Sequence, residues 1–233
     1  MDDQNAFFAA LELIGGLDPT LGSVVALSLR VTLSAVVISA VIGLPVGAAL
    51  ALARFAGRNA VIVMFNTLMG FPPVVAGLIV YLLLSHSGPL GFFDMLFTVP
   101  AMIAAQTVLI TPIIVSLTRQ VVEDLWAEYA EQLRSLGSST LRAIPTLLWD
   151  SRFSLITAIL AGFGRASAEV GAVLIVGGNI EHVTRTMTTT IALETSKGNL
   201  ALALGFGIIL IGLTLVLNAG AFVAGRFAQR VAG

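Results

Sequence analysis

Residues 31–53 read VTLSAVVISAVIGLPVGAALALA, a run without a single charged side chain. A helix that crosses the hydrocarbon core of a bilayer needs about 20 mainly apolar residues, so this run is long enough to span a membrane. We expect the helix to begin near Leu21, which puts Arg30 near its outer end. An arginine there can extend its charged end to the interface, and that is the interpretation we favour for Arg30.

The rest of the chain follows the same pattern. Of its 233 residues, 57% are hydrophobic and 11% are charged, whereas soluble domains carry about 25% charged residues. We therefore predict an all-α polytopic membrane protein with about five transmembrane helices over residues 21–233. Residues 1–20 hold a shorter apolar stretch, for which an interfacial helix and a sixth membrane element both stay open. The other four spans are expected at about 61–85, 95–118, 153–178 and 198–225.

Basic residues near the span ends predict the orientation. One face of the membrane collects Arg54, Arg58, Arg119, Arg134, Arg142, Arg152, Arg226 and Arg230, and the other has only Arg185 and Lys197. Lysine and arginine concentrate on the cytoplasmic side of membrane proteins. We therefore expect the charged loop 119–152 and the C-terminus in the cytoplasm, and the N-terminus outside.

Several function classes find no support in the residues. The chain has no cysteine and a net charge near zero, so neither a thiolate metal site nor a nucleic-acid partner is indicated. Its one lysine, Lys197, is followed by glycine, whereas an ATP-binding Walker A loop needs Gly-Lys-Ser/Thr. His86 and His182 are far apart and lack metal-ligand spacing. We predict no catalytic residue, metal site or cofactor in this chain.

The 119–152 loop has the pattern of a helical hairpin. Apolar residues recur at helical spacing at Leu125, Tyr129, Leu133 and Leu136, which predicts an amphipathic helix. Gly137 suits the position after its last turn, and Ser138 or Ser139 could cap a second helix that contains Pro145. A connector lying on the membrane is one alternative. A docking surface for a soluble partner is the one we favour, because partner grooves take anchors at such spacing.

The segment from Glu131 to Gly137 resembles the "EAA" loop of permease subunits of ABC importers, in which Glu-Ala-Ala precedes a glycine by three residues. Gln132 and Leu133 stand here in place of the two alanines. The resemblance implies that the loop fits a cleft on an ATPase subunit. ATP and Mg would then be bound by that partner. The residues expected at the contact are Glu131, Leu133, Leu136, Gly137 and Ser138.

Residues 162–180, GFGRASAEVGAVLIVGGNI, are similar to the corresponding segment of molybdate and tungstate permeases, which share Arg-x3-Glu-x-Gly and a closing Gly-Asn. With residues 184–198, the segment looks like the tungstate branch. This resemblance implies a type I ABC importer permease for tungstate, with molybdate or sulfate as the alternative. It also implies a homodimer, two ATPase subunits and an extracytoplasmic oxyanion-binding protein, in the cytoplasmic (inner) membrane of a bacterium or archaeon. A secondary transporter and an intramembrane enzyme are less favoured.

Arg165 and Glu169 are four residues apart, so they share one face of a helix. Either charge alone would cost at least ~2.5 kcal/mol at the bilayer centre, and we predict that they pair. The pair either lines the anion path or locks the helix packing. We favour the second role slightly, because conduction requires weak binding along the path.

Other residues are candidates for the pore or its gate. Ser167 and Gly171 have the small-x3-small spacing of close helix contacts in lipid. Phe71-Pro72-Pro73 predicts a kink beside a bulky ring, with or without a gate. The complete candidate set for the pore or gate is Phe71, Pro72, Pro73, Arg165, Ser167, Glu169, Gly171 and Asn179.

Overall fold

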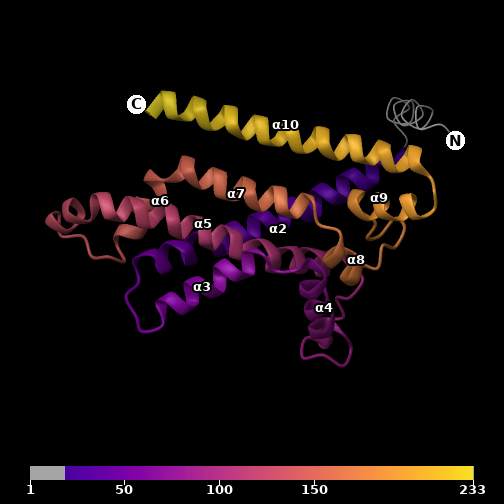
Figure 1. Ribbon diagram of the computed structural model, residues 1–233, viewed down its shortest axis with the longest axis horizontal. Coiled ribbons are helices and arrows are strands. Elements are labelled where there is room, and N and C mark those ends of the chain that lie inside the picture. The colour runs from indigo at the N-terminus through magenta and orange to yellow at the C-terminus, as the bar shows by residue number, and fades with distance from the viewer. Residues whose placement is uncertain (1–18, 233) are drawn as a thin grey trace. The chain divides into compact units, whose positions relative to one another are not determined.

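The computed structural model describes residues 19–232, and within that range it contains helices and connections but no strand (Figure 1). This confirms the all-α prediction. The predicted N-terminal segment, residues 1–20, lies outside the described residues except for its last two. The helices are α2 (Pro19–Leu52), α3 (Arg58–Met69), α4 (Pro73–Leu84), the 3-10 turn η1 (Gly91–Phe93), α5 (Val99–Ser135), α6 (Ala143–Asp150), α7 (Arg152–Ser167), α8 (Gly171–Gly177), α9 (Met187–Ser196) and α10 (Leu200–Ala232).

The described chain divides into two compact units. The first comprises residues up to 35, 72–106 and 165–218, and the second comprises 36–71, 107–164 and the residues after 218. Four of the described helices, α2, α5, α7 and α10, contribute to both units because the boundaries fall within them.

Three helices are long and apolar enough to cross a membrane: α2, α5 and α10. Two further pairs, α3 with α4 and α6 with α7, qualify only when each bent pair is counted as one span. The described residues thus hold three to five candidate spans, and the predicted five is the upper value. The chain is a multi-pass membrane protein.

Two predicted spans are not continuous helices, which corrects the sequence-based expectation. In the 61–85 segment, α3 ends at Met69 and α4 begins at Pro73. Pro73 is the first residue of α4, where the missing N–H costs no helical hydrogen bond, so the proline starts a helix rather than kinking one. In the 153–178 segment, α7 ends at Ser167 and α8 begins at Gly171. Hydropathy depends only on composition, so it does not distinguish a continuous helix from two helices separated by a short break.

Arg58 organises the second unit. Its Nε and Nη2 donate to the carbonyl oxygens of Leu50 and Ala51, both at 3.0 Å. These carbonyls belong to the last turn of α2, where no later N–H group of the helix is available to donate a hydrogen bond to them. Arg58 also pairs with Glu123 of α5 at 3.0 Å, and Arg119 binds the other oxygen of Glu123. The end of α2 is therefore tied to α3 and α5 through one guanidinium.

Close backbone packing organises the first unit. Helices α4 and α8 lie against each other (Figure 1). A Cβ atom added to Gly77 of α4 would lie 2.6 Å from the Cα of Ala172 in α8, and one added to Gly171 would lie 2.9 Å from a methyl group of Val74. Only glycine permits this approach, as in other small-residue helix contacts in lipid.

We predict that Gly77→Ala destabilises the protein, because its methyl group would overlap backbone atoms of Ala172. Thermal unfolding of the purified protein in detergent should show a midpoint several degrees below wild type. Gly212→Ala is the matched control, because a Cβ there meets nothing within 4 Å and alanine favours a helix by roughly 0.5–1 kcal/mol over glycine. Equal midpoints for the two variants would contradict the close α4–α8 packing.

Candidate functional site

Glu169 lies in the short break between α7 and α8, and its side chain is only 1% exposed. One carboxylate oxygen accepts a hydrogen bond from Nη1 of Arg165 at 2.7 Å. The other oxygen accepts from the backbone N–H of Ala172 at 2.9 Å, in the first turn of α8. The backbone carbonyl of Glu169 accepts from the hydroxyl of Thr188, in α9, at 2.8 Å. This one residue therefore connects α7, α8 and α9.

The predicted pairing of Arg165 with Glu169 is confirmed, but the two residues do not share one continuous helix. Glu169 lies beyond the end of α7, and its carboxylate caps the start of the next helix. Lipid cannot satisfy the free N–H groups at a helix start, so the carboxylate does so. Both of its oxygens are engaged, which favours the locking role of the pair over the lining role.

The other candidate pore residues lie at the ends of helices. Ser167 ends α7, Gly171 begins α8, and both are half-buried. Asn179 follows α8 with a positive φ of 51°, and its buried Oδ1 has no hydrogen-bond partner among the described residues. The Glu169 break thus gathers Arg165, Ser167 and Gly171 locally along the chain.

The Phe71-Pro72-Pro73 segment forms the turn between α3 and α4. Phe71 and Pro73 are half-buried, and Pro72 is exposed. Pro72 precedes the first turn of α4, and its carbonyl accepts from the N–H of Ala76 at 3.1 Å. The segment is a break in the helix, and its role as a gate stays a prediction.

The predicted helix end at Gly137 is confirmed. Helix α5 runs to Ser135, and Gly137 has a φ of 75°. Its N–H donates to the carbonyl of Arg134 at 2.9 Å, and the N–H of Ser138 donates to that of Leu133 at 2.9 Å. This pair of bonds is the Schellman arrangement, which requires a left-handed residue and therefore favours glycine.

The predicted serine cap of the second helix is wrong. Helix α6 begins at Ala143 after Arg142, without a side-chain cap. The hydroxyl of Ser138 instead faces the carbonyl of Ser139 at 3.3 Å. Residues 138–139 have no regular structure and residues 140–142 form a turn, so the second helix starts later than the serines suggest. Pro145 lies in its first turn, where proline is tolerated.

The two helices form a hairpin with an apolar core and exposed apolar residues. Leu133 packs against a core cluster that includes Val122 and Leu147, so this predicted contact residue faces inward. Leu136, by contrast, is 82% exposed. Leu141 and Trp149, which sequence reasoning did not select, are 75% and 69% exposed. The predicted contact residues Glu131 and Gly137 are also exposed, and Ser138 is half-buried.

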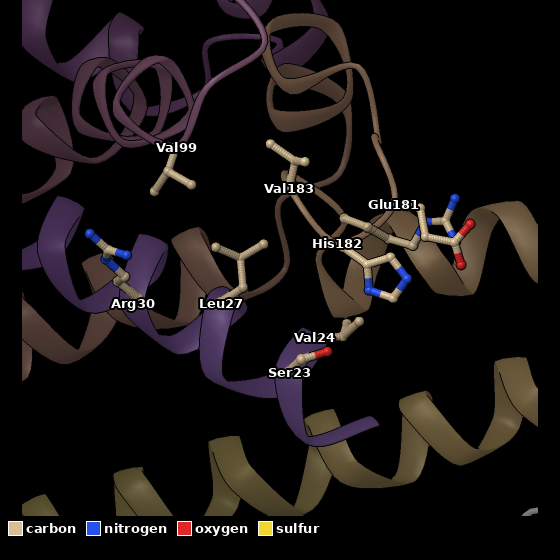
Figure 2. A pocket seen from close by; sticks show the side chains of 9 residues that line it. Ser23, Val24, Leu27, Arg30, Val99, Glu181, His182 and Val183 are labelled. Atoms are coloured by element: carbon tan, nitrogen blue, oxygen red, sulfur yellow. The ribbon is translucent and has the colours of Figure 1, made fainter. Parts of the chain in front are cut away.

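A cavity of about 250 Å³ lies in the first unit (Figure 2). Its lining comes from α2, from the start of α5 and from the loop that joins α8 to α9. Sequence reasoning missed it, because α2 and that loop are far apart in the chain. The lining residues are Ser23, Val24, Leu27, Arg30, Val99, Glu181, His182, Val183 and Arg185.

Two arginines, Arg30 and Arg185, line this cavity, against one carboxylate, that of Glu181. Arg185 pairs with Glu181 at 3.2 Å. The hydrogen bond from Lys197 is the main cause that lowers the pKa of Glu194, and the charge of Arg185 adds to that shift. Within residues 19–232, Arg30 forms no ion pair with a carboxylate, and no cluster of three metal-binding side chains occurs. The cavity therefore suits an anion better than a cation.

Comparison with known proteins gives clear similarities, although no family model matches. The chain is 41% identical to a probable anion ABC transporter permease protein of Haloferax volcanii, over 94% of this chain and 96% of the relative. It is 35% identical to a tungstate uptake system permease protein of Peptoclostridium acidaminophilum, over 91% and 93% of the two chains. A molybdenum transport system permease protein of Azotobacter vinelandii is 28% identical over 71% and 76%.

We predict that Arg165 and Glu169 are energetically coupled. Arg165→Met should destabilise the protein because it leaves the buried carboxylate without its charged partner. Glu169→Gln should do so by leaving the guanidinium unpaired, and the double variant should lose less than the sum of the two. Thermal unfolding of the four proteins gives the coupling. If the loss in the double variant equals the sum of the two single losses, the pair does not stabilise the fold.

Proposed function

The chain belongs to the permease subunits of ABC transporters for anions, and from this we propose that it forms the membrane pathway of an ATP-driven importer of tungstate. The observation that supports this substrate is the similarity, over 91% of the chain, to a tungstate uptake permease. Family membership removes the secondary transporter and the intramembrane enzyme from consideration. Molybdate and sulfate stay the alternatives, because a molybdenum permease and a sulfate permease are also similar, at lower identity.

The anion pathway is proposed to form between two copies of the chain. A permease with three to five candidate spans cannot readily enclose a conduit for a dianion alone, and closed two-fold symmetry is the commonest solution. We place the N-terminus outside and the C-terminus in the cytoplasm of a bacterial or archaeal inner membrane, since the basic residues favour this orientation. An extracytoplasmic binding protein would deliver the anion and contribute most of the selectivity.

The 119–152 hairpin is the proposed contact with each of two ATPase subunits. Its exposed apolar side chains, Leu136, Leu141 and Trp149, are costly to leave in water and suit a protein groove. The packed core beneath them, with Leu133 and Leu147, makes the hairpin stiff enough to transmit movement. The ATPase subunits would hold ATP and Mg, and this chain would hold no cofactor.

Uptake measurements test the substrate. The permease is reconstituted with its ATPase and binding protein in vesicles, and accumulated tungsten, molybdenum and sulfur are measured by mass spectrometry. We expect ATP-dependent accumulation of tungstate, with molybdate transported less well at equal concentration. An ATPase subunit that cannot hydrolyse ATP is the control and should abolish uptake. ATP-driven uptake of molybdate or sulfate in preference to tungstate would refute the assignment.

Substitution at Gly137 tests the coupling role. Gly137→Val places a β-branched residue at φ 75° and should distort the Schellman turn. We expect uptake to fall at least about tenfold relative to ATP hydrolysis, while the membrane dimer still assembles. Gly57→Val is the matched control, since Gly57 has a φ of 89° outside the hairpin. Substrate-stimulated hydrolysis and uptake that stay coupled in Gly137→Val would contradict the proposed contact.

A further inference from the structure

The cavity beside α2 has the chemistry of an anion site. Four of its lining residues are apolar: Val24 and Leu27 of α2, Val99 of α5 and Val183 of the loop. Figure 2 shows Arg30 on the α2 side and the His182 ring and Glu181 on the side of the 181–185 loop. The volume of about 250 Å³ is several times the roughly 30 Å³ that one water occupies in the liquid. A tetrahedral oxyanion with some of its hydration water fits in such a space.

Arg30 carries the excess positive charge of the cavity. It is exposed, and among residues 19–232 no carboxylate forms an ion pair with it. A guanidinium presents a planar array of N–H donors that matches oxyanions. Snorkelling alone therefore does not account for the position of Arg30, because its side chain lines a cavity with further polar groups.

Arg185 can contribute a second donor group. Its own side chain is 19% exposed, but that of its partner Glu181 is 60% exposed, and solvent on the carboxylate side weakens such an ion pair. An incoming dianion can therefore compete with Glu181 for the guanidinium.

The loop that holds Arg185 is ordered before any ligand arrives. The buried hydroxyl of Thr184 donates to the carbonyl of Gly177 at 2.5 Å and accepts from the N–H of Ile180 at 2.9 Å. The N–H groups of Thr184 and Arg185 both point to the carbonyl of Ile180, at 3.0 and 3.1 Å. A site held in place in this way loses less entropy when it binds its ligand.

The position of Arg30 along α2 suits a site at the outer surface. About 20 residues are needed to cross the hydrocarbon core. Counted back from Leu52, the end of α2, they reach Leu33. Arg30 lies almost one helical turn beyond that point, where water and dissolved anions have access.

We propose that this cavity is an outer binding site for the transported oxyanion, with Arg30 as its principal contact and Arg185 as its second. The inference rests on the proposed function, which supplies the substrate class. An arginine that pairs with no carboxylate among residues 19–232 attracts a dianion without holding it firmly, as conduction requires. The site would receive tungstate released by the binding protein before the pathway opens.

The phosphate group of an anionic lipid could bind the same arginines, so the experiment distinguishes tungstate from lipid phosphate as the ligand of the cavity. The nucleotide-free complex of permease and ATPase, without binding protein, is placed in phosphatidylcholine nanodiscs and dialysed against sodium tungstate. Bound tungsten is then measured by mass spectrometry. We expect saturable binding that persists when phosphatidylglycerol is added to the discs. Binding that phosphatidylglycerol abolishes would assign the cavity to lipid phosphate and overturn the proposal.

Variants show whether the cavity holds the bound ion. Arg30→Gln should weaken binding about tenfold, as expected for losing one charge-assisted hydrogen-bonding group. Arg30→Lys, which keeps the charge without the fork of donors, should lose less, and Arg185→Gln should also weaken binding. Arg54→Gln removes the same charge from an exposed position in the second unit and should bind within about twofold of wild type. Equal affinities for Arg30→Gln and wild type would overturn the proposal.

Uptake by the same preparations separates this inference from the proposed function. Wild-type protein that imports tungstate but shows no saturable binding would overturn the outer site and leave the function intact. Wild-type protein that binds tungstate through Arg30 but imports only sulfate would support the site and overturn the tungstate assignment.

Discussion

A helix that breaks within a membrane segment leaves backbone N–H groups that lipid cannot satisfy, and here the carboxylate of Glu169 meets that need at the start of α8. A buried carboxylate needs a partner in turn, and Arg165 supplies it from the last turn of α7. The backbone carbonyl of Glu169 also accepts a hydrogen bond from Thr188 of α9. With α8 fixed, glycines at its contact with α4 allow the two backbones to meet. The arrangement of the first unit thus depends on one buried ion pair and on the glycines at the contact between α4 and α8.

Much of this could be predicted from the sequence, because the signals are local. The charge-free runs identify α2, α5 and α10, the i,i+4 spacing identifies the Arg165–Glu169 pair, and Gly137 marks a helix end. Phe71-Pro72-Pro73 predicted a kink near the break at Gly70, although not the end of one helix and the start of another. The break at Ala168 could not be predicted in the same way, since an apolar run has the same hydropathy whether its helix is continuous or interrupted. The cavity could not be predicted either, because α2 and the 181–185 loop line it together only through tertiary structure.

The 119–152 hairpin shows where helical spacing fails to predict which side chains are exposed. Its first helix was predicted with Leu133 and Leu136 on one stripe, but these residues have different environments. The helix ends between them at Ser135, so helical spacing no longer decides the direction of Leu136. The same turn brings Leu141 to the exposed surface. A docking surface can therefore depend on where a helix stops as much as on its apolar stripe.

The proposed importer uses the two units of the chain for different tasks. The hairpin belongs to the second unit, and the Glu169 break and the cavity belong to the first, while α5 runs through both. A cross-linking measurement tests this assignment most directly, because the chain has no cysteine of its own. In the assembled transporter, Leu136→Cys should form a cross-link with the ATPase subunit. Phe92→Cys, at an exposed position within η1, should not. A cross-link from Phe92→Cys and none from Leu136→Cys would contradict both the orientation and the role of the hairpin.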